Sequence, residues 1–390
     1  MSRIVAVEAL PLRVASQESY LGSMPDGGET PVEGYFRRPP WGSLYSSAFE
    51  TLVVRIEADD GVVGWGEALA PVAPQVPARI VTELLAPQLI GTDPSAVGAR
   101  FRELRELMRE RGHLGGHQAD ALAAIDIALW DLKGKLCGEP IASLLGGPTQ
   151  DPVPAYISGL PRPTDEERAQ LAAEWQQQGW GHVKLHLGYG LDEDLDTVRA
   201  VRTAAPDLRI AVDAHWAYSL PTARMFSRAF AELGGWFLEA PLPPEDVDGH
   251  RDLARTTEVP IALGESLRHR FEQRPFLEQR GVNLWQPDIG RTGITEGWAT
   301  ILLAEAHHIP SAPHHSTGLG IAMAAGLHVA AAVPDLLAFE FQPTTFEVAN
   351  RLLTTPLVAE QGVIPLPPGP GLGASVDEDA IRRASITTHP

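Results

Sequence analysis

Three acidic residues in the middle of the chain are evenly spaced, and each closes a run of mainly apolar residues. They are Asp213, Glu239 and Glu265, and both steps between them are 26 residues. A period near 26 fits one strand, one helix and two short loops, which is the repeating unit of a (β/α)₈ barrel. The spacing therefore predicts that the three acids end adjacent parallel strands of such a barrel.

Acids at the carboxyl ends of barrel strands would lie on the rim where these barrels hold their active sites. Mg²⁺ binds a few protein carboxylates and keeps positions for water and substrate oxygens. The pattern thus predicts a Mg²⁺ site made by Asp213, Glu239 and Glu265. A single acid after a strand can instead cap the following helix. The equal register of three acids favours the metal site.

Composition limits the class of protein further. A chain of 390 residues fits a barrel of about 250 residues and one smaller domain. The net charge of −19 argues against nucleic acid or an anionic membrane as partner. Cys137 is the single cysteine, so no intramolecular disulfide can form. We found no apolar run approaching the roughly 20 residues of a membrane span and no signal peptide, so a cytoplasmic enzyme is expected.

The first part of the chain mixes strand and helix patterns. Residues 3–13 alternate like a strand, 51–56 and 62–67 form a predicted hairpin, and helical patterns fill much of 77–136. We therefore predict an α+β capping domain over residues 1–125.

Residues 16–46 lack periodicity and are predicted to form a long loop. A loop of this length is usually functional or disordered. Its run Phe36–Trp41 is cationic and aromatic in an otherwise acidic chain. The composition favours a lid over an anionic substrate, with Arg38, Trp41 and Tyr45 as candidate substrate contacts. The alternative is a surface loop without a role in binding.

From residue 152 strand and helix patterns alternate strictly, which predicts a modified (β/α)₈ TIM-type barrel of the α/β class over residues 126–354. The predicted strands are 153–158, 182–187, 209–215, 236–241, 261–266, 283–288, 310–314 and 337–341, and predicted helices include 166–178, 192–204 and 294–307. Residues 355–390 are rich in Pro and Gly and are expected to return to the capping domain.

The other predicted strand ends also carry ionisable residues. Lys184 and His186 alternate on strand two, so both face inward, and His215 follows Asp213 by two. Lys184 taken alone could be a strand-end lysine that extends its ammonium group to water. Its place in a ring of ionisable groups favours a catalytic role.

Strands six, seven and eight continue the series. Asp288, His314 and Glu340 follow Glu265 at steps of 23, 26 and 26 residues. The regular steps predict that these side chains also meet at the rim of the barrel.

This constellation resembles the mandelate racemase subgroup of the enolase superfamily. The resemblance also includes the run Ala123–Lys135, the tripeptide Gly138–Pro140 and the run Leu144–Gly147. It implies that the three evenly spaced acids are magnesium ligands, that Asp288 and His314 form a His-Asp dyad, and that the enzyme is a homo-oligomer.

Two details resemble the acid sugar dehydratases of the galactonate and mannonate type. They are the triplets Asp213-Ala214-His215 and Ala312-Pro313-His314. Many relatives carry Lys-x-Lys on strand two, whereas this chain carries Lys184 and His186.

The resemblance implies a Mg²⁺-dependent dehydratase that converts a small sugar acid to a 2-keto-3-deoxy acid. His314 would remove the proton α to the carboxylate, and His215 would protonate the departing hydroxyl. Lys184 and a protonated Glu340 would stabilise the enediolate. His186 or Lys184 would be a base on the opposite face.

Alternatives within the same fold are a racemase or epimerase, which two opposed bases favour, and a lactone cycloisomerase. A barrel that binds without catalysis is disfavoured because all candidate ionisable groups are present.

Overall fold

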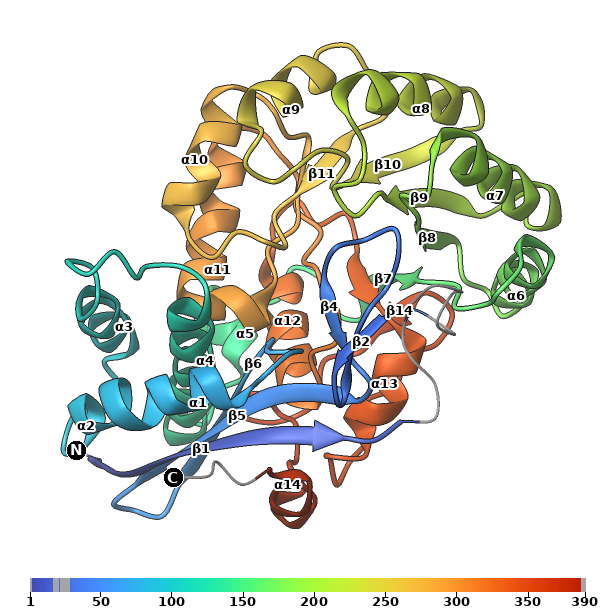
Figure 1. Ribbon diagram of the computed structural model, residues 1–390. Coiled ribbons are helices and arrows are strands. Elements are labelled where there is room, and N and C mark those ends of the chain that lie inside the picture. Colours follow the sequence, from blue (N-terminus) through green and yellow to red (C-terminus); the bar gives the residue numbers. More distant parts are fainter. Residues whose placement is uncertain (1, 17–20, 22–28, 387–390) are drawn as a thin grey trace.

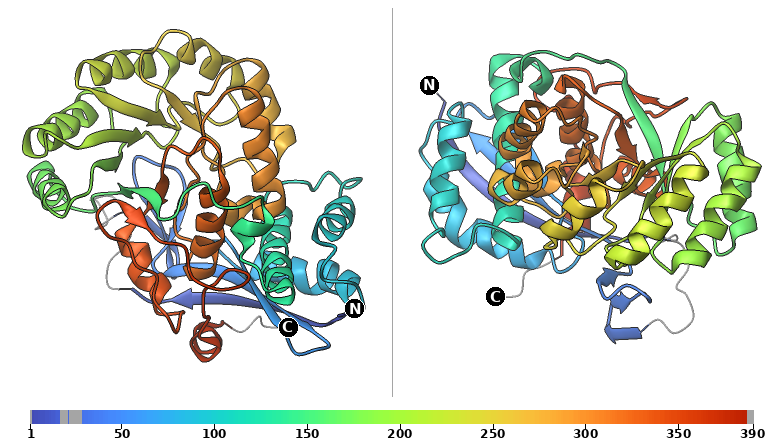
Figure 2. Two further views of the ribbon diagram at one scale, coloured as in Figure 1. Left: turned by 180° about the vertical axis from the view of Figure 1, so that it is seen from behind. Right: turned by 90° about the horizontal axis from the view of Figure 1, so that it is seen from above.

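The computed structural model describes residues 2–16, 21 and 29–386. An antiparallel α+β domain, blue to cyan in Figure 1, lies beside a parallel barrel surrounded by helices, green to orange. The first described strand, β1 (Ile4–Val14), and the last helix, α14 (Glu378–Ala384), lie side by side at the first domain, as Figure 2 also shows. The predicted fold class, a modified TIM-type barrel with an α+β capping domain, is confirmed. Within the described residues no helix is long and apolar enough to cross a membrane.

A three-stranded antiparallel sheet forms the base of the first domain. Its strands are β1 (Ile4–Val14), β5 (Phe49–Ala58) and β6 (Val63–Ala68), in the order β1-β5-β6. The predicted hairpin is confirmed as β5 and β6. The other elements of this domain are α1 (Gln75–Ile80), the π-helical turn η1 (Val81–Leu85), α2 (Ala86–Leu89), α3 (Val97–Glu106) and α4 (His117–Cys137).

Strand β6 lies unusually close to α4. A Cβ atom added to Gly66 would lie 1.9 Å from the backbone oxygen of Ala124, and one added to Gly64 would lie 2.2 Å from that of Ala128. Only glycine allows this approach of strand and helix backbones.

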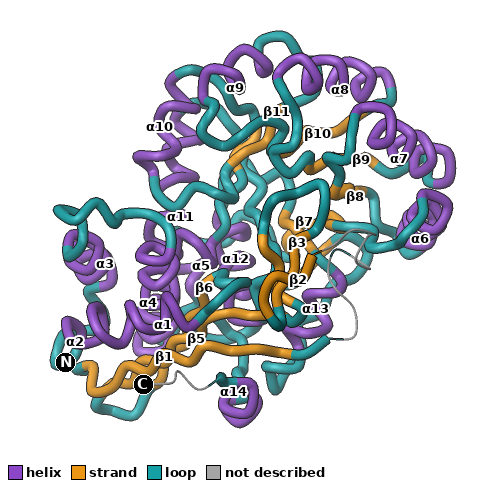
Figure 3. Tube along the Cα trace, in the orientation of Figure 1, coloured by secondary structure: helices purple, strands orange, loops and turns teal. Residues whose placement is uncertain are grey.

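The prediction that residues 16–46 form a loop without regular structure is wrong for its second half. This part forms a small antiparallel sheet of β2 (Glu29–Val32), β3 (Tyr35–Arg37) and β4 (Leu44–Ser46) (Figure 3). Strands of three or four residues are too short to show a clear alternation. The rings of Phe36 and Tyr45, which are partners across β3 and β4, stack at 5.9 Å. Residues 17–20 and 22–28 of the predicted loop lie outside the described residues.

Seven parallel strands make up most of the barrel wall, in the order β12-β11-β10-β9-β8-β7-β13. They are β7 (Val153–Ser158), β8 (His182–His186), β9 (Arg209–Asp213), β10 (Gly235–Glu239), β11 (Ile261–Leu263), β12 (Leu284–Trp285) and β13 (Phe339–Phe341). Each overlaps a predicted strand. The observed strands end up to three residues earlier, as β11 does at 263 against the predicted 266.

The predicted strand 310–314 is reduced to isolated bridges. Ser311 bridges both Trp285 and Leu336, so this segment still closes the ring between β12 and the residues before β13. Pro310 and Pro313 lack the N–H groups that a continuous ladder needs. The prolines explain why the strand is interrupted here while its position in the barrel is kept.

Helices surround the barrel, and the three predicted helices are confirmed. They correspond to α6 (Asp165–Gln177), α7 (Leu191–Ala204) and the second part of α11 (Ile289–Ala306). This second part follows Gly293, whose φ of 70° is not helical. The remaining elements are α5 (Ile141–Leu144), α8 (Leu220–Glu232), α9 (Val247–Ala254), α10 (Arg270–Glu278), α12 (Gly320–Ala332), α13 (Pro343–Asn350), β14 (Val363–Ile364) and α14 (Glu378–Ala384).

The two domains share α4. The division proposed at 125–126 falls inside this helix, which packs on β6 and also on α11 of the barrel. The buried carboxylate of Asp126 accepts hydrogen bonds from the backbone N–H and the hydroxyl of Thr295, at 2.7 and 2.6 Å. The C-terminal segment returns to the capping domain through α14, where the N–H of Ile386 donates to the oxygen of Pro11 at 2.9 Å.

We predict that Gly66→Ala destabilises the protein by about 1–3 kcal/mol, because the new methyl group must push β6 and α4 apart. Urea unfolding measures the loss. Gly42→Ala is the matched control, since a Cβ at exposed Gly42 meets nothing within 4 Å. Equal midpoints for the two variants would contradict the close packing of β6 on α4.

Candidate active site

The site residues stand one layer above the apolar filling of the barrel. The apolar layer consists of Tyr156, Ala211, Phe237, Ala262, Leu284, Ala312 and Ala338. Side chains two positions apart on a strand face the same way. For six members of this layer, the residue two positions later in the chain is polar. These six polar residues are Ser158, Asp213, Glu239, Gln286, His314 and Glu340. The alternation thus places apolar side chains in the interior of the barrel and polar side chains at its rim.

Lys184 on β8 is fully buried between two carboxylates. Its Nζ lies 2.8 Å from Oε2 of Glu239 and 2.7 Å from Oε1 of Glu340. Burial opposes the charge, but the two carboxylates raise the pKa of Lys184 well above its ordinary value. Lys184 is therefore an ammonium group at neutral pH.

A candidate metal centre lies beside Lys184. Ligand atoms of Glu239, Glu265 and His314 lie within 4.8 Å of one another. Oε1 of Glu239 is buried and has no hydrogen-bond partner, which is costly for a carboxylate oxygen. Burial raises the pKa of Glu239 to about 7, although Lys184 lowers it. An unpaired carboxylate oxygen beside a second carboxylate fits a divalent cation.

Asp213, the third predicted metal ligand, lies outside this group of three. It neighbours Glu239 in the β9–β10 ladder, and its Oδ1 accepts the N–H of His215 at 2.9 Å. Burial raises the pKa of Asp213 to about 7, against the effect of Lys184. A site made by all three carboxylates remains a prediction.

His314 and Asp288, which were predicted to form a dyad, are hydrogen-bonded. Nδ1 of His314 lies 2.6 Å from Oδ2 of Asp288, and its Nε2 lies 2.6 Å from Oε2 of Glu265. Burial opposes protonation of His314. The nearby carboxylates of Glu340, Glu265 and Asp288 nevertheless raise its pKa well above the ordinary value.

Glu340 differs from its predicted protonated form. Burial would raise its pKa, but Lys184 and His314 lower the pKa to about 2. Its hydrogen-bond partners also favour an ionised acceptor, because Lys184, Ser158 and the backbone N–H of His315 all donate to it. The structure therefore favours the carboxylate.

The segment predicted to be a lid covers His215. The rings of Trp41 and His215 stack at 4.0 Å with an interplanar angle of 13°, and Trp41 also contacts Tyr189. Arg38 is buried and lies over Trp41. Burial lowers the pKa of His215 to about 4. Its φ of 47° is in the left-handed region, which is uncommon for a residue other than glycine and concentrates at functional sites.

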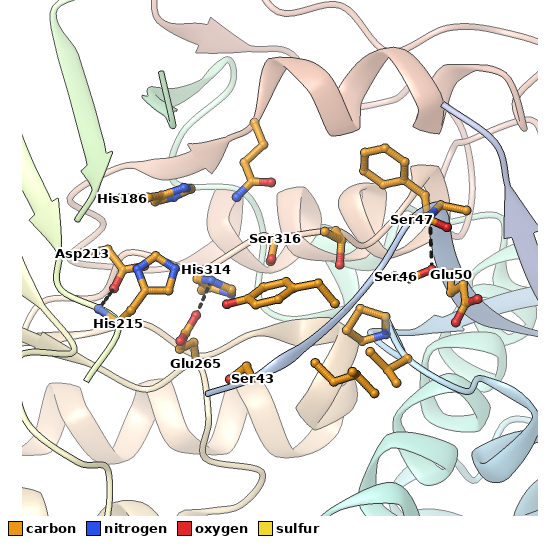
Figure 4. Close-up of a pocket in the computed structure, with 18 of the residues that line it drawn as sticks. Ser43, Ser46, Ser47, Glu50, His186, Asp213, His215, Glu265, His314 and Ser316 are labelled. Carbon is orange, nitrogen blue, oxygen red and sulfur yellow. Dashed lines mark hydrogen bonds and ion pairs between the residues drawn. The ribbon is translucent and has the colours of Figure 1, made fainter. Parts of the chain in front are cut away.

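A cavity of about 260 Å³ joins these groups. His186, Asp213, His215, Glu265 and His314 line it, and in the view of Figure 4 the histidines lie at one end and Ser46, Ser47 and Glu50 at the other. Other polar residues of the lining are Ser16, Ser43, Tyr45, Ser316, Thr317, Arg291 and Gln342. The cavity thus combines an ionisable end with many hydroxyl groups.

Sequence reasoning missed several polar residues of the site and of the cavity. Ser158 ends β7 and follows buried Tyr156 by two, so the strand-end rule that selected the other residues also applies to it. Arg291 lies three residues after Asp288, in the first turn of α11. Ser316 and Thr317 lie in a loop where no periodicity indicates their direction.

Family comparisons match both domains. Residues 41–146 match the model of the mandelate racemase / muconate lactonizing enzyme N-terminal domain. Residues 166–380 match that of the enolase C-terminal domain-like family. The chain belongs to the mandelate racemase subgroup of the enolase superfamily. This confirms the resemblance drawn from the sequence motifs.

Relatives of this enolase superfamily enzyme catalyse different reactions. D-galactarolactone cycloisomerase from Agrobacterium fabrum is 35% identical over 344 residues, covering 85% of this chain and 90% of the relative. D-galactonate dehydratase from Ralstonia pickettii is 33% identical over 350 residues, covering 84% and 89%. Identity at this level does not decide which reaction this enzyme catalyses.

Solved structures of the superfamily match the whole chain. A member from Agrobacterium tumefaciens superposes with a TM-score of 0.93 at 36% identity, covering 98% of both chains. A racemase from Streptomyces coelicolor A3(2) with bound magnesium has a TM-score of 0.84 at 25% identity, covering 98% of this chain and 100% of the other.

We predict that Mg²⁺ stabilises the protein against unfolding by about 2.7 kcal/mol at roughly 100 times its Kd, and that Glu239→Gln removes this increment. The measurement is the difference in unfolding free energy with and without Mg²⁺. Glu258→Gln, at an exposed acid on the barrel, is the control and should keep the increment. An increment retained in Glu239→Gln would argue against the candidate metal centre.

Proposed function

We propose that this enolase superfamily enzyme is a Mg²⁺-dependent dehydratase that removes water from a small sugar acid to give a 2-keto-3-deoxy acid. The observation that carries the proposal is the cavity, in which the His314–Asp288 dyad and His215 meet beside a hydroxyl-lined space. Such a space suits a ligand with one carboxylate and several hydroxyls. The similarity to D-galactonate dehydratase supports the same reaction. A cytoplasmic homo-oligomer is part of the proposal.

Glu239 and Glu265, with neighbouring Asp213, would hold the Mg²⁺ ion. When bound, the ion supplies a positive charge that stabilises the enediolate formed from the substrate carboxylate. Lys184 adds a fixed ammonium group that needs no rearrangement, because Glu239 and Glu340 already orient it.

His314 would remove the α-proton. Asp288 holds its Nδ1 and stabilises the imidazolium that forms, which leaves Nε2 to accept the proton. In this structure Nε2 contacts Glu265 and the raised pKa favours the imidazolium. The base role therefore requires that contact to be released, which removes one cause of the raised pKa.

His215 would protonate the departing hydroxyl, so that the C–O bond breaks with loss of water. It lines the cavity next to Asp213. Its lowered pKa favours the neutral imidazole. An anionic substrate bound beside it would favour the protonated form.

The alternative is an epimerase or lactone cycloisomerase, and one observation favours it. His186 also lines the cavity, from a different strand than His314, so two histidines are available to exchange protons. Lys184 is a poor second base because its ammonium group is paired with two carboxylates. His186 is therefore the better candidate for that role. The similarity to D-galactarolactone cycloisomerase also supports this alternative.

We expect a screen of mono- and di-acid sugars and their lactones with Mg²⁺ to yield a keto acid lighter than its substrate by one water. Mass spectrometry separates the two candidate functions, because epimerisation and cycloisomerisation leave the mass unchanged. A product of unchanged mass would reject the dehydratase and support the alternative.

We predict that His314→Asn lowers kcat by about 10²–10⁴-fold, as expected for the loss of a general base. His307→Asn, at an exposed histidine, should leave kcat unchanged. The stabilisation by Mg²⁺ should persist in His314→Asn. Its loss would assign His314 to the metal centre instead, since its imidazole lies within the cluster of candidate ligands.

A further inference from the structure

Ser158 links His186 to Glu340. It is 3% exposed at the end of β7, and its Oγ lies 2.5 Å from Oε1 of Glu340 and 3.1 Å from Nε2 of His186. A serine hydroxyl has a single hydrogen to donate. Which neighbour receives that hydrogen determines where the proton of neutral His186 resides.

Glu340 receives it. Oε1 of Glu340 is also 2.7 Å from the ammonium group of Lys184, and Oε2 accepts the backbone N–H of His315 at 3.2 Å. If Oε1 carried a proton for Ser158 instead, a protonated oxygen would face the ammonium group. An ionised Glu340 avoids this clash and accepts from all its donors.

His186 must therefore donate to Ser158. With its hydrogen directed to Glu340, Oγ of Ser158 can only accept from Nε2 of His186. A neutral imidazole carries its hydrogen on one nitrogen and a lone pair on the other. The lone pair of His186 is then on Nδ1, and His186 lines the cavity. Burial, together with His215 and Lys184, lowers the pKa of His186 well below its ordinary value, which agrees with a neutral ring.

We propose that Ser158 is a positioning residue that holds His186 in the Nε2–H tautomer, so that Nδ1 is the atom that exchanges protons with substrate. The catalytic part rests on the alternative function proposed above, the epimerase or lactone cycloisomerase, in which His186 is the second base. When the C–H bond breaks, its electron pair stays on the substrate as the enediolate and the proton goes to Nδ1. The imidazolium keeps the hydrogen bond that its Nε2–H donates to Ser158. Ser158 in turn donates its hydroxyl hydrogen to the carboxylate of Glu340.

The tautomer is measured directly by NMR on protein with ¹⁵N-labelled histidine, and His186→Gln identifies the signals. We expect a protonated Nε2 and an unprotonated Nδ1 in the wild type and in Ser158→Thr, which keeps the hydroxyl. Ser158→Ala should lose this preference. A protonated Nδ1 in the wild type, or an unchanged tautomer in Ser158→Ala, would overturn the proposal.

Kinetics test the catalytic part. Ser158→Ala should lower kcat on the order of 10–100-fold with a much smaller change in KM, and Ser158→Thr should restore most of it. Ser227→Ala removes a buried serine hydroxyl in α8, away from the site, and is the control for folding. An unchanged kcat in Ser158→Ala would reject the role in catalysis. If no sugar acid reacts, the proposed function fails, while the NMR result still decides the positioning role.

Discussion

The site depends on an excess of buried negative charge that Lys184 offsets only in part. Asp213, Glu239, Glu265 and Glu340 all lie close to this ammonium group or to one another. Carboxylates buried together repel one another, and removing their water is costly. A divalent cation relieves both effects. The same charge distribution therefore explains three features. Lys184 pairs with Glu239 and Glu340, one oxygen of Glu239 has no hydrogen-bond partner, and the site suits a divalent metal ion.

The site is complete only because two domains meet. The barrel supplies the ionisable rim, and the capping domain supplies the aromatic wall through Trp41. Glu67 on β6 connects the two domains. Its buried carboxylate accepts hydrogen bonds from the backbone N–H groups of Leu319 and Ala322, at 2.6 and 2.8 Å, at the start of α12. Negative charge at a helix N-terminus is stabilising. The helix that follows the loop of His314 is thus anchored to the other domain.

The barrel and most of its rim were predictable because both follow from periodicity along the chain. The 26-residue step locates Asp213, Glu239 and Glu265, and the two-residue alternation applies equally to Ser158, whose neutral side chain made it inconspicuous. Contacts between distant segments leave no such pattern. The stacking of Trp41, the very short strands β2–β4 and the pairing of His314 with Glu265 depend on tertiary structure, and sequence periodicity does not carry that information.

The Trp41–His215 stack affects the proton affinity of this histidine. The indole ring lies flat on the imidazole and keeps water from that face of the ring. Moving the indole aside would hydrate His215 and remove the burial that lowers its pKa. The proton affinity of this histidine thus depends on an aromatic contact from the capping domain, so displacing the indole would change the chemistry of the site.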